Sequence, residues 1–182
     1  MRGGCLTYRY SANEELYETL TFAVEELLKT IDGLGRISSY TVQTEFSGWD
    51  LWCRKYVLSG LQHFYSICKD EGLKAQIMTA MKKTADYICA HIGDGKKDIR
   101  DTSNFWGGLN SCTILEPFVE LYKLTGKRQY LEFAEYIIRS GGCSRGDMFA
   151  CVEKEGSSPL QYPTTKAYET MSLYIHFPLR RL

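Results

Sequence analysis

The sequence predicts an all-α fold built from antiparallel helical hairpins that stand side by side in a toroid. Two observations lead to this prediction. Apolar residues recur at three- and four-residue steps in several segments, which is the period of a helix with one buried face. Pairs of such segments return after about 55 residues, a period that suits helical hairpins carrying a long loop at one end.

The clearest hairpin spans residues 115–140. Leu115, Phe118 and Leu121 fall on one helical face, and the second half of the segment carries another apolar stripe. Thr125-Gly126 separates the two halves, and glycine commonly ends a helix. Because the connection is short, the two helices are expected to lie antiparallel.

The same pattern occurs earlier in the chain. Leu58, Leu61 and Phe64 repeat the spacing of the apolar residues in the first half of 115–140. Leu6 and Tyr10 precede Leu61 and Tyr65 by a similar distance. We therefore expect three hairpins of related structure.

In chain order, helices are predicted at 1–12, 13–31, 50–69, 73–92, 115–125, 127–140 and 164–176. Long loops are predicted at 32–48, 94–109 and 141–163. Asn13 and Asp50 are the expected N-caps of their helices, and prolines at 159 and 163 argue against a helix there. Because each long loop precedes the first helix of a hairpin, the loops gather at one end, where binding residues are commonly found.

Composition limits the function. The chain has 182 residues, which we treat as one domain, 1–182, and 22 basic residues balance 22 acidic ones. No basic patch predicts nucleic acid binding, and no apolar run approaches the ~20 residues of a membrane span. The first residues lack the apolar core of a signal peptide, so the chain is cytoplasmic or its natural start lies elsewhere, and the localisation stays open.

The seven cysteines contain no Cys-x-x-Cys motif, and those within helical patterns are expected to be buried thiols. Cys143 and Cys151 flank a loop, where pairing or metal binding is the alternative. No metal site and no cofactor is predicted.

Aromatic and charged residues gather at the junctions between the long loops and the helices. Indole faces stack against sugar rings and carboxylates accept hydrogen bonds from hydroxyl groups, so a carbohydrate is the expected ligand. The predicted substrate-binding residues are Trp49, Asp50, Trp52, Trp106, Glu116, Lys166 and Glu169. No catalytic residue is assigned, because spacing alone does not select the pair of carboxylates that glycoside hydrolysis requires.

Each of these residues also has a structural interpretation. Trp49 and Trp52 are large enough to belong partly to the core. Asp50 is a candidate helix cap, and Glu116 lies in a first helical turn, where carboxylates are favoured anyway. Lys55 could form a structural ion pair with either carboxylate.

Three ordered segments resemble a known family. Residues 48–65 are similar to the WDxWxxKYxxxGLxxxY segment of glycoside hydrolase family 127, the β-L-arabinofuranosidase-like proteins. Residues 111–131 resemble the second hairpin of that family, and 166–172 the start of a third. The resemblance runs from Cys5 to Ser172 and implies an (α/α)6 barrel with a sugar pocket at its loop end.

The chain departs from the family pattern in ways that matter for function. The family's arabinofuranosidases place histidines where this chain has Trp49, Ser111 and Lys166, so the resemblance does not imply the same sugar. It does imply a zinc site of cysteines and glutamate, with a nucleophilic cysteine and a glutamate acid/base, but no motif in this chain matches it. After Ser172 the sequence diverges, and Pro178 interrupts the expected helix.

These departures lead to three expectations. The chain forms an incomplete (α/α)6 toroid that is part of a larger six-hairpin barrel. It is a glycoside hydrolase-like, carbohydrate-active protein that is inactive as a glycosidase by itself; the alternative is a non-catalytic helical-repeat module that binds protein or peptide. Its open edges and apolar end favour a homodimer.

Overall fold

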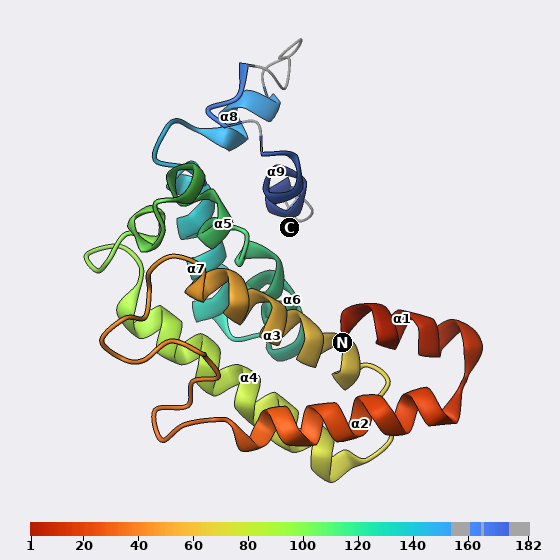
Figure 1. Ribbon diagram of the computed structural model, residues 1–182. Coiled ribbons are helices and arrows are strands. Elements are labelled where there is room, and N and C mark those ends of the chain that lie inside the picture. Colours follow the sequence, from red (N-terminus) through yellow and green to blue (C-terminus); the bar gives the residue numbers. More distant parts are fainter. Residues whose placement is uncertain (154–160, 165, 175–182) are drawn as a thin grey trace.

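The computed structural model describes residues 1–153, 161–164 and 166–174 (Figure 1). Within these ranges the regular structure is helical and no strand forms, which confirms the predicted all-α class. A single isolated bridge between Ile92 and Lys97 is the only β pairing found in the described ranges.

The helices follow the predicted order. They are α1 (Arg2–Ser11), α2 (Glu14–Lys29), α3 (Asp50–Tyr65), α4 (Glu71–His91), α5 (Leu109–Cys112), α6 (Leu115–Thr125), α7 (Arg128–Arg139), α8 (Met148–Glu153) and α9 (Ala167–Tyr174). Two short 3₁₀ turns, η1 (Ile99–Thr102) and η2 (Phe105–Gly108), precede α5.

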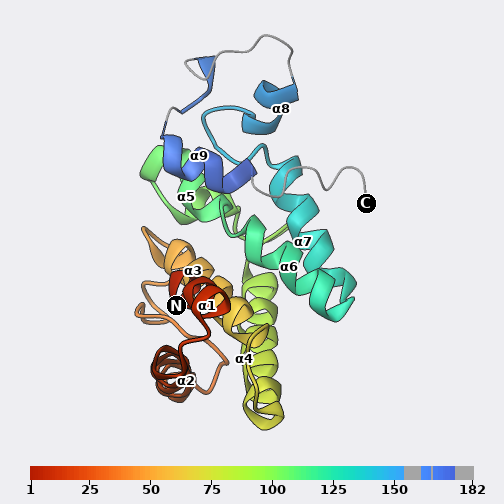
Figure 2. The same ribbon diagram turned by 90° about the vertical axis from the view of Figure 1, so that its right-hand side faces the viewer.

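The long helices are arranged in two layers. In one layer α1 contacts α3, α3 contacts α6, and α6 contacts α9. In the other, α2 contacts α4 and α4 contacts α7. Figure 1 shows α1 lying above α2 and α3 above α4, and Figure 2 shows α6 beside α7. Consecutive helices also contact one another across the layers: α1 contacts α2, α3 contacts α4, and α6 contacts α7.

Short turns close the hairpins as the sequence indicates. Asn13 Oδ1 accepts a hydrogen bond from the Leu16 N–H at 2.8 Å, which confirms the predicted cap of α2. Gly126 ends α6 with a φ of 66°, a conformation that glycine adopts without steric cost. The chain then turns back into α7 through Lys127 alone.

The apolar core lies between the two layers. The residues paired by the sequence pattern are buried in both α3 and α6: Leu58, Leu61, Phe64, Leu115, Phe118 and Leu121. In α1 the pattern points to the wrong face, because Leu6 is 49% and Tyr10 95% exposed while the neighbouring Cys5 is buried.

Several boundaries differ from prediction. The helix expected at 50–69 ends at Tyr65, and α4 begins at Glu71 because the Asp70 carboxylate caps it through the Leu73 N–H at 2.6 Å. The loop expected at 141–163 contains α8, whose first turn is capped by Asp147 through the N–H groups of Phe149 and Ala150.

Three further expectations concern the cysteines, membrane spans and the C-terminal apolar segment. All seven cysteines are free thiols, and five of them, including Cys143, are buried. None of the described helices is long and apolar enough to cross a membrane. The apolar segment that includes Pro178 lies outside the described residues; Leu173, just before it, is buried in α9.

Candidate functional site

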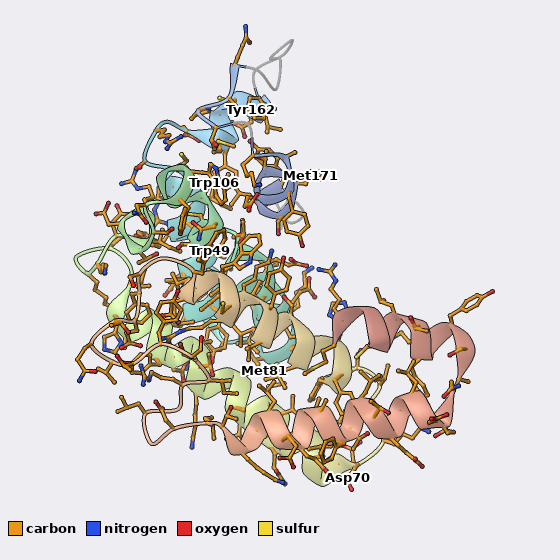
Figure 3. The ribbon with its side chains drawn as sticks, in the orientation of Figure 1. Trp49, Asp70, Met81, Trp106, Tyr162 and Met171 are labelled. Atoms are coloured by element: carbon orange, nitrogen blue, oxygen red, sulfur yellow. The ribbon has the colours of Figure 1, made fainter. Side chains whose placement is uncertain are left out.

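Four aromatic side chains from two different loop–helix junctions meet at the N-terminal end of α3. Trp49 stacks on Phe105 with ring centroids 4.7 Å apart, and it meets the edges of Trp52 and Trp106 at 5.8 and 5.7 Å. Figure 3 shows Trp49 and Trp106 close together, at the end of the α3/α4 hairpin opposite to Asp70. All three tryptophans of the chain therefore belong to one aromatic cluster.

The first turn of α9 extends this cluster. Tyr168 approaches Trp52 with ring centroids 5.7 Å apart, and its hydroxyl forms a 2.6 Å hydrogen bond with the hydroxyl of Tyr56. Lys166, just before α9, places its ammonium group 4.9 Å from the centre of the Trp106 ring, within cation–π range. The third junction thus packs beside the other two.

Backbone geometry around Trp106 holds the cluster in place. Trp106 has a φ of 49°, which is uncommon for a residue with a side chain. Gly108 follows with a φ of 79°, and a Cβ atom there would lie 2.2 Å from the carbonyl oxygen of Arg100. The Ser144 N–H donates to the Gly107 carbonyl at 2.8 Å and so ties this turn to the loop after α7.

Below the cluster, Lys55 carries a buried ammonium group. Its side chain is 2% exposed, its Nζ lies 3.6 Å from Glu116 Oε2, and it donates a hydrogen bond to Ser172 Oγ of α9. Nζ also lies 5.2 Å from the ring centre of Trp52. Burial lowers the pKa of Lys55, and the nearby charge of Glu116 opposes this shift.

Two buried carboxylates flank Lys55. Glu116 accepts a hydrogen bond from Arg2 at 2.8 Å through Oε1, but its Oε2 has no hydrogen-bond partner. Glu169 is 3% exposed, and its Oε2 also has none. Because a buried polar atom without a partner costs free energy, these two oxygens are available to a ligand's hydroxyl groups.

Asp50 is held differently from the other predicted residues. It is fully buried; Oδ1 accepts from Ser38 and Arg54, and Oδ2 accepts from the Phe46 N–H at 2.8 Å. The prediction that it caps its helix is wrong, because α3 begins at Asp50 and the cap position is taken by Trp49, which makes no side-chain cap bond. With both oxygens occupied, Asp50 supports the loop that presents Trp49.

The structure therefore brings most of the predicted residues together. Trp49, Trp52, Trp106 and Lys166 form or border the aromatic cluster, and Lys55 links it to Glu116 and Glu169. Sequence reasoning missed Phe105 and Tyr56. The signal for Tyr56 was its position four residues after Trp52, which places both on one helical face.

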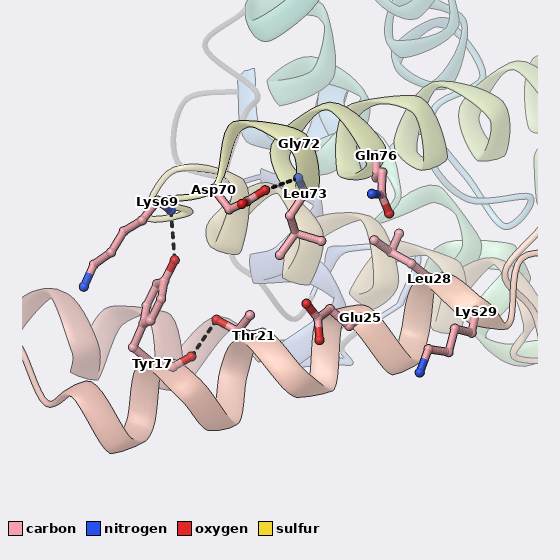
Figure 4. A pocket seen from close by; sticks show the side chains of 10 residues that line it. All are labelled: Tyr17, Thr21, Glu25, Leu28, Lys29, Lys69, Asp70, Gly72, Leu73 and Gln76. Atoms are coloured by element: carbon pink, nitrogen blue, oxygen red, sulfur yellow. Dashed lines mark hydrogen bonds between the residues drawn. The ribbon is translucent and has the colours of Figure 1, made fainter.

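A cavity with a volume of about 790 Å³ lies elsewhere, between α2 and α4 (Figure 4). Three of its four charged residues have partners: Lys69 pairs with Glu14 at 2.8 Å, Lys29 pairs with Glu26, and Asp70 caps α4. No unpartnered buried side-chain atom belongs to its lining. Size alone does not make it the better candidate for the site.

The zinc site implied by the family resemblance does not fit the described residues. No three His, Cys, Asp or Glu side chains in the described part of the chain lie close enough together to hold a metal ion. Burial raises the pKa of Cys89 to about 12 and also raises that of Cys112, which disfavours the thiolate needed for coordination.

The structure defines an all-α protein in which three tryptophans gather beside buried carboxylates. A family model described as Beta-L-arabinofuranosidase, GH127 catalytic domain, matches residues 1–167. Because this match covers most of the 182 residues, the chain belongs to that family. No curated protein and no solved structure is significantly similar to it.

Proposed function

We propose that this chain is a glycoside hydrolase-like protein that binds a carbohydrate at the aromatic cluster. Family membership supports the general class. The observation that carries the proposal is the pair of buried oxygens without a hydrogen-bond partner, Glu116 Oε2 and Glu169 Oε2, close to the buried Lys55 and the three tryptophans. A sugar offers an apolar ring face to the indoles and hydroxyl donors to the carboxylates.

Each residue has a role in this proposal. Trp49 and Trp106 provide the faces on which a ring stacks, and Trp52 packs against Trp49. Glu169 and Glu116 accept hydrogen bonds from hydroxyl groups. Lys55 pairs with Glu116 and lies close enough to Glu169 to interact with its charge, and Lys166 borders the entrance beside Trp106.

We also propose that the hairpins form an arc of an (α/α) toroid. The contacts from α1 to α3 to α6 to α9 in one layer, and from α2 to α4 to α7 in the other, support this arrangement. Under this proposal the aromatic cluster lies at the end of the inner layer where the long loops gather.

Intrinsic fluorescence tests sugar binding directly, because every tryptophan of the chain lies in the cluster. We expect a spectral shift on titration with at least one member of a glycan panel, and loss of binding in Trp49→Ala. Tyr10→Ala, on a side chain that is 95% exposed on α1, is the matched aromatic control and should bind normally. Circular dichroism of both variants checks that they are folded.

The alternative module, which binds peptide without acting on sugars, gives a different outcome. Binding to a peptide library with no response to any glycan would overturn the carbohydrate proposal. Hydrolysis is a separate measurement: we propose that the 182-residue chain does not cleave aryl glycosides. Cleavage that disappears in Glu116→Gln would contradict this.

A further inference from the structure

A second, smaller cavity lies on the far side of Lys55 from the tryptophans. It has a volume of about 330 Å³, within the range of small-molecule sites, and is formed by α1, α3 and α6. Ser59, Gln62 and His63 lie one and two turns beyond Lys55 on α3. A cavity of this size suits one ring or a short chain and not an oligosaccharide.

Two buried side chains lining this cavity have an oxygen without a hydrogen-bond partner, although Glu116 Oε2 lies 3.6 Å from the ammonium group of Lys55. Ser59 is 2% exposed and Glu116 is 6% exposed, yet neither Ser59 Oγ nor Glu116 Oε2 has a hydrogen-bond partner. Native interiors satisfy nearly all such groups, so each unsatisfied one points to a missing partner. Two of them on one cavity wall indicate a bound molecule with several polar atoms.

Arg2 and Glu120 also line the cavity, but Arg2 pairs with Glu116 and Glu120 pairs with Lys123. The remaining polar groups define the chemistry of the bound molecule. Arg9 donates to Ser66 Oγ at 2.6 Å and forms no ion pair with a carboxylate in the described ranges, so most of its guanidinium donors stay available. Gln62 uses its amide N–H on the Pro117 carbonyl at 2.7 Å, which leaves its oxygen as an acceptor. The ring Nδ1 of His63 donates to the Ser59 carbonyl, which leaves Nε2 available.

We propose that this cavity binds a small hydroxylated carboxylate, a sugar acid in chemical class. The planar guanidinium of Arg9 matches the two oxygens of a carboxylate. Glu116 Oε2 and the Gln62 oxygen accept from hydroxyl groups of the same ligand, and Ser59 Oγ donates to another. The aromatic cluster takes no part, and Glu116 is the one residue that this site shares with the carbohydrate site proposed above, so the variants that separate the two sites leave Glu116 unchanged.

Calorimetry with the 182-residue chain tests the proposal. D-glucuronate and D-gluconate are the probes, and D-glucose and D-glucitol are their neutral counterparts. We expect binding of at least one acid, affinity that falls with ionic strength, and at least about tenfold weaker binding of the neutral compound. Absence of binding by both acids, or equal affinity for acid and neutral compound, would overturn it.

Variants locate the binding. Arg9→Gln should weaken acid binding at least about tenfold, because it removes the charged partner of the carboxylate. Arg128→Gln, on an exposed arginine of α7, is the matched control and should leave binding unchanged. Ser59→Ala should weaken binding while leaving the chain folded, since its hydroxyl has no protein partner. Unchanged affinity in Arg9→Gln overturns the assignment.

Different substitutions test the carbohydrate site at the aromatic cluster and the acid site in the second cavity. Trp49→Ala should abolish binding at the aromatic cluster and leave acid binding intact, whereas Arg9→Gln should do the reverse. Loss of acid binding in Trp49→Ala would show that the acid occupies the aromatic cluster and would overturn the second site.

Discussion

Arg54 and Asp50 form an ion pair that is closed to solvent. They are one helical turn apart in α3, with Arg54 Nε 2.9 Å from Asp50 Oδ1 and a second guanidinium nitrogen 2.9 Å from Oδ2. Neither side chain has any exposed surface. Since Asp50 also accepts from the Phe46 N–H, the pair fixes the loop that leads into Trp49.

Replacing Asp50 by Asn should destabilise the protein strongly. The substitution leaves the buried Arg54 guanidinium with Glu45 but without its second carboxylate, and breaking a buried ion pair costs about 3–5 kcal/mol. Urea unfolding measures the loss. Asp94→Asn, which breaks the exposed Arg139–Asp94 pair, is the control and should cost less than about 1 kcal/mol. Similar losses in both variants would show that the buried pair contributes no more than a surface one.

Glu45 should make the protein sensitive to acid. Burial alone would raise its pKa, but hydrogen bonds from Tyr87, Arg36 and Arg54 outweigh burial and hold the pKa below its ordinary value of 4.5. The unfolded chain therefore binds this proton at a higher pH than the native protein does. The stability that Glu45 contributes is complete above pH 4.5 and is lost as the pH falls through the lower, native pKa.

The test compares pH profiles of the free energy of unfolding. The wild-type protein should lose stability below about pH 4.5, and Glu45→Gln should lose less over the same range. At neutral pH the variant should be about 3–5 kcal/mol less stable, because it leaves two arginines without their shared partner. Parallel acid profiles for the two proteins would rule out Glu45 as the source.

The sequence predicted the hairpins because their signals are local. Helical periodicity, the Asn13 cap and Gly126 act within a few residues; the cap and the glycine have their expected structure, and the periodicity identified the buried faces of α3 and α6 but not that of α1. The hydrogen bonds of Asp50 could not be predicted from local signals, since its partner Ser38 lies in a loop without regular structure. Similarly, Trp49 and Trp106 were each predicted as site residues, but their contact depends on how two hairpins pack.

Gly108 should tolerate no side chain. A Cβ atom would meet the Arg100 carbonyl oxygen at 2.2 Å, and the φ of 79° is unfavourable for any other residue. Gly108→Ala should therefore lose at least about 2 kcal/mol, seen as a melting temperature at least about 4 °C lower. Gly33→Ala, where a Cβ atom would meet nothing within 4 Å, is the control and should melt normally.

Self-association stays a prediction. In the described ranges α1 exposes Leu6 and Tyr10, which are 49% and 95% accessible. Exposed apolar side chains at the edge of a helical array favour contact with a second copy. Light scattering should show a mass that rises with concentration, and Tyr10→Ser should reduce the rise. A constant monomer mass across the concentration range would contradict the homodimer.

The substitution Glu169→Gln should distinguish a role in ligand binding from a role in stability. The carboxylate of Glu169 is buried, its Oε2 has no hydrogen-bond partner, and its main compensations are the N-terminal end of α9 and the charge of Lys55. Glu169→Gln keeps the shape and removes the buried charge. We expect a free energy of unfolding within about 1 kcal/mol of wild type, or higher, because burying an unsatisfied charge is costly.

Sugar binding, unlike stability, should weaken in Glu169→Gln. The amide introduced by Glu169→Gln offers one acceptor oxygen in place of two charged ones, so affinity measured by tryptophan fluorescence should fall at least about tenfold. Glu132→Gln, on the exposed face of α7, is the control and should change neither property. A loss of more than about 2 kcal/mol of stability in Glu169→Gln with unchanged binding would mean that this carboxylate supports the fold and does not contact a ligand.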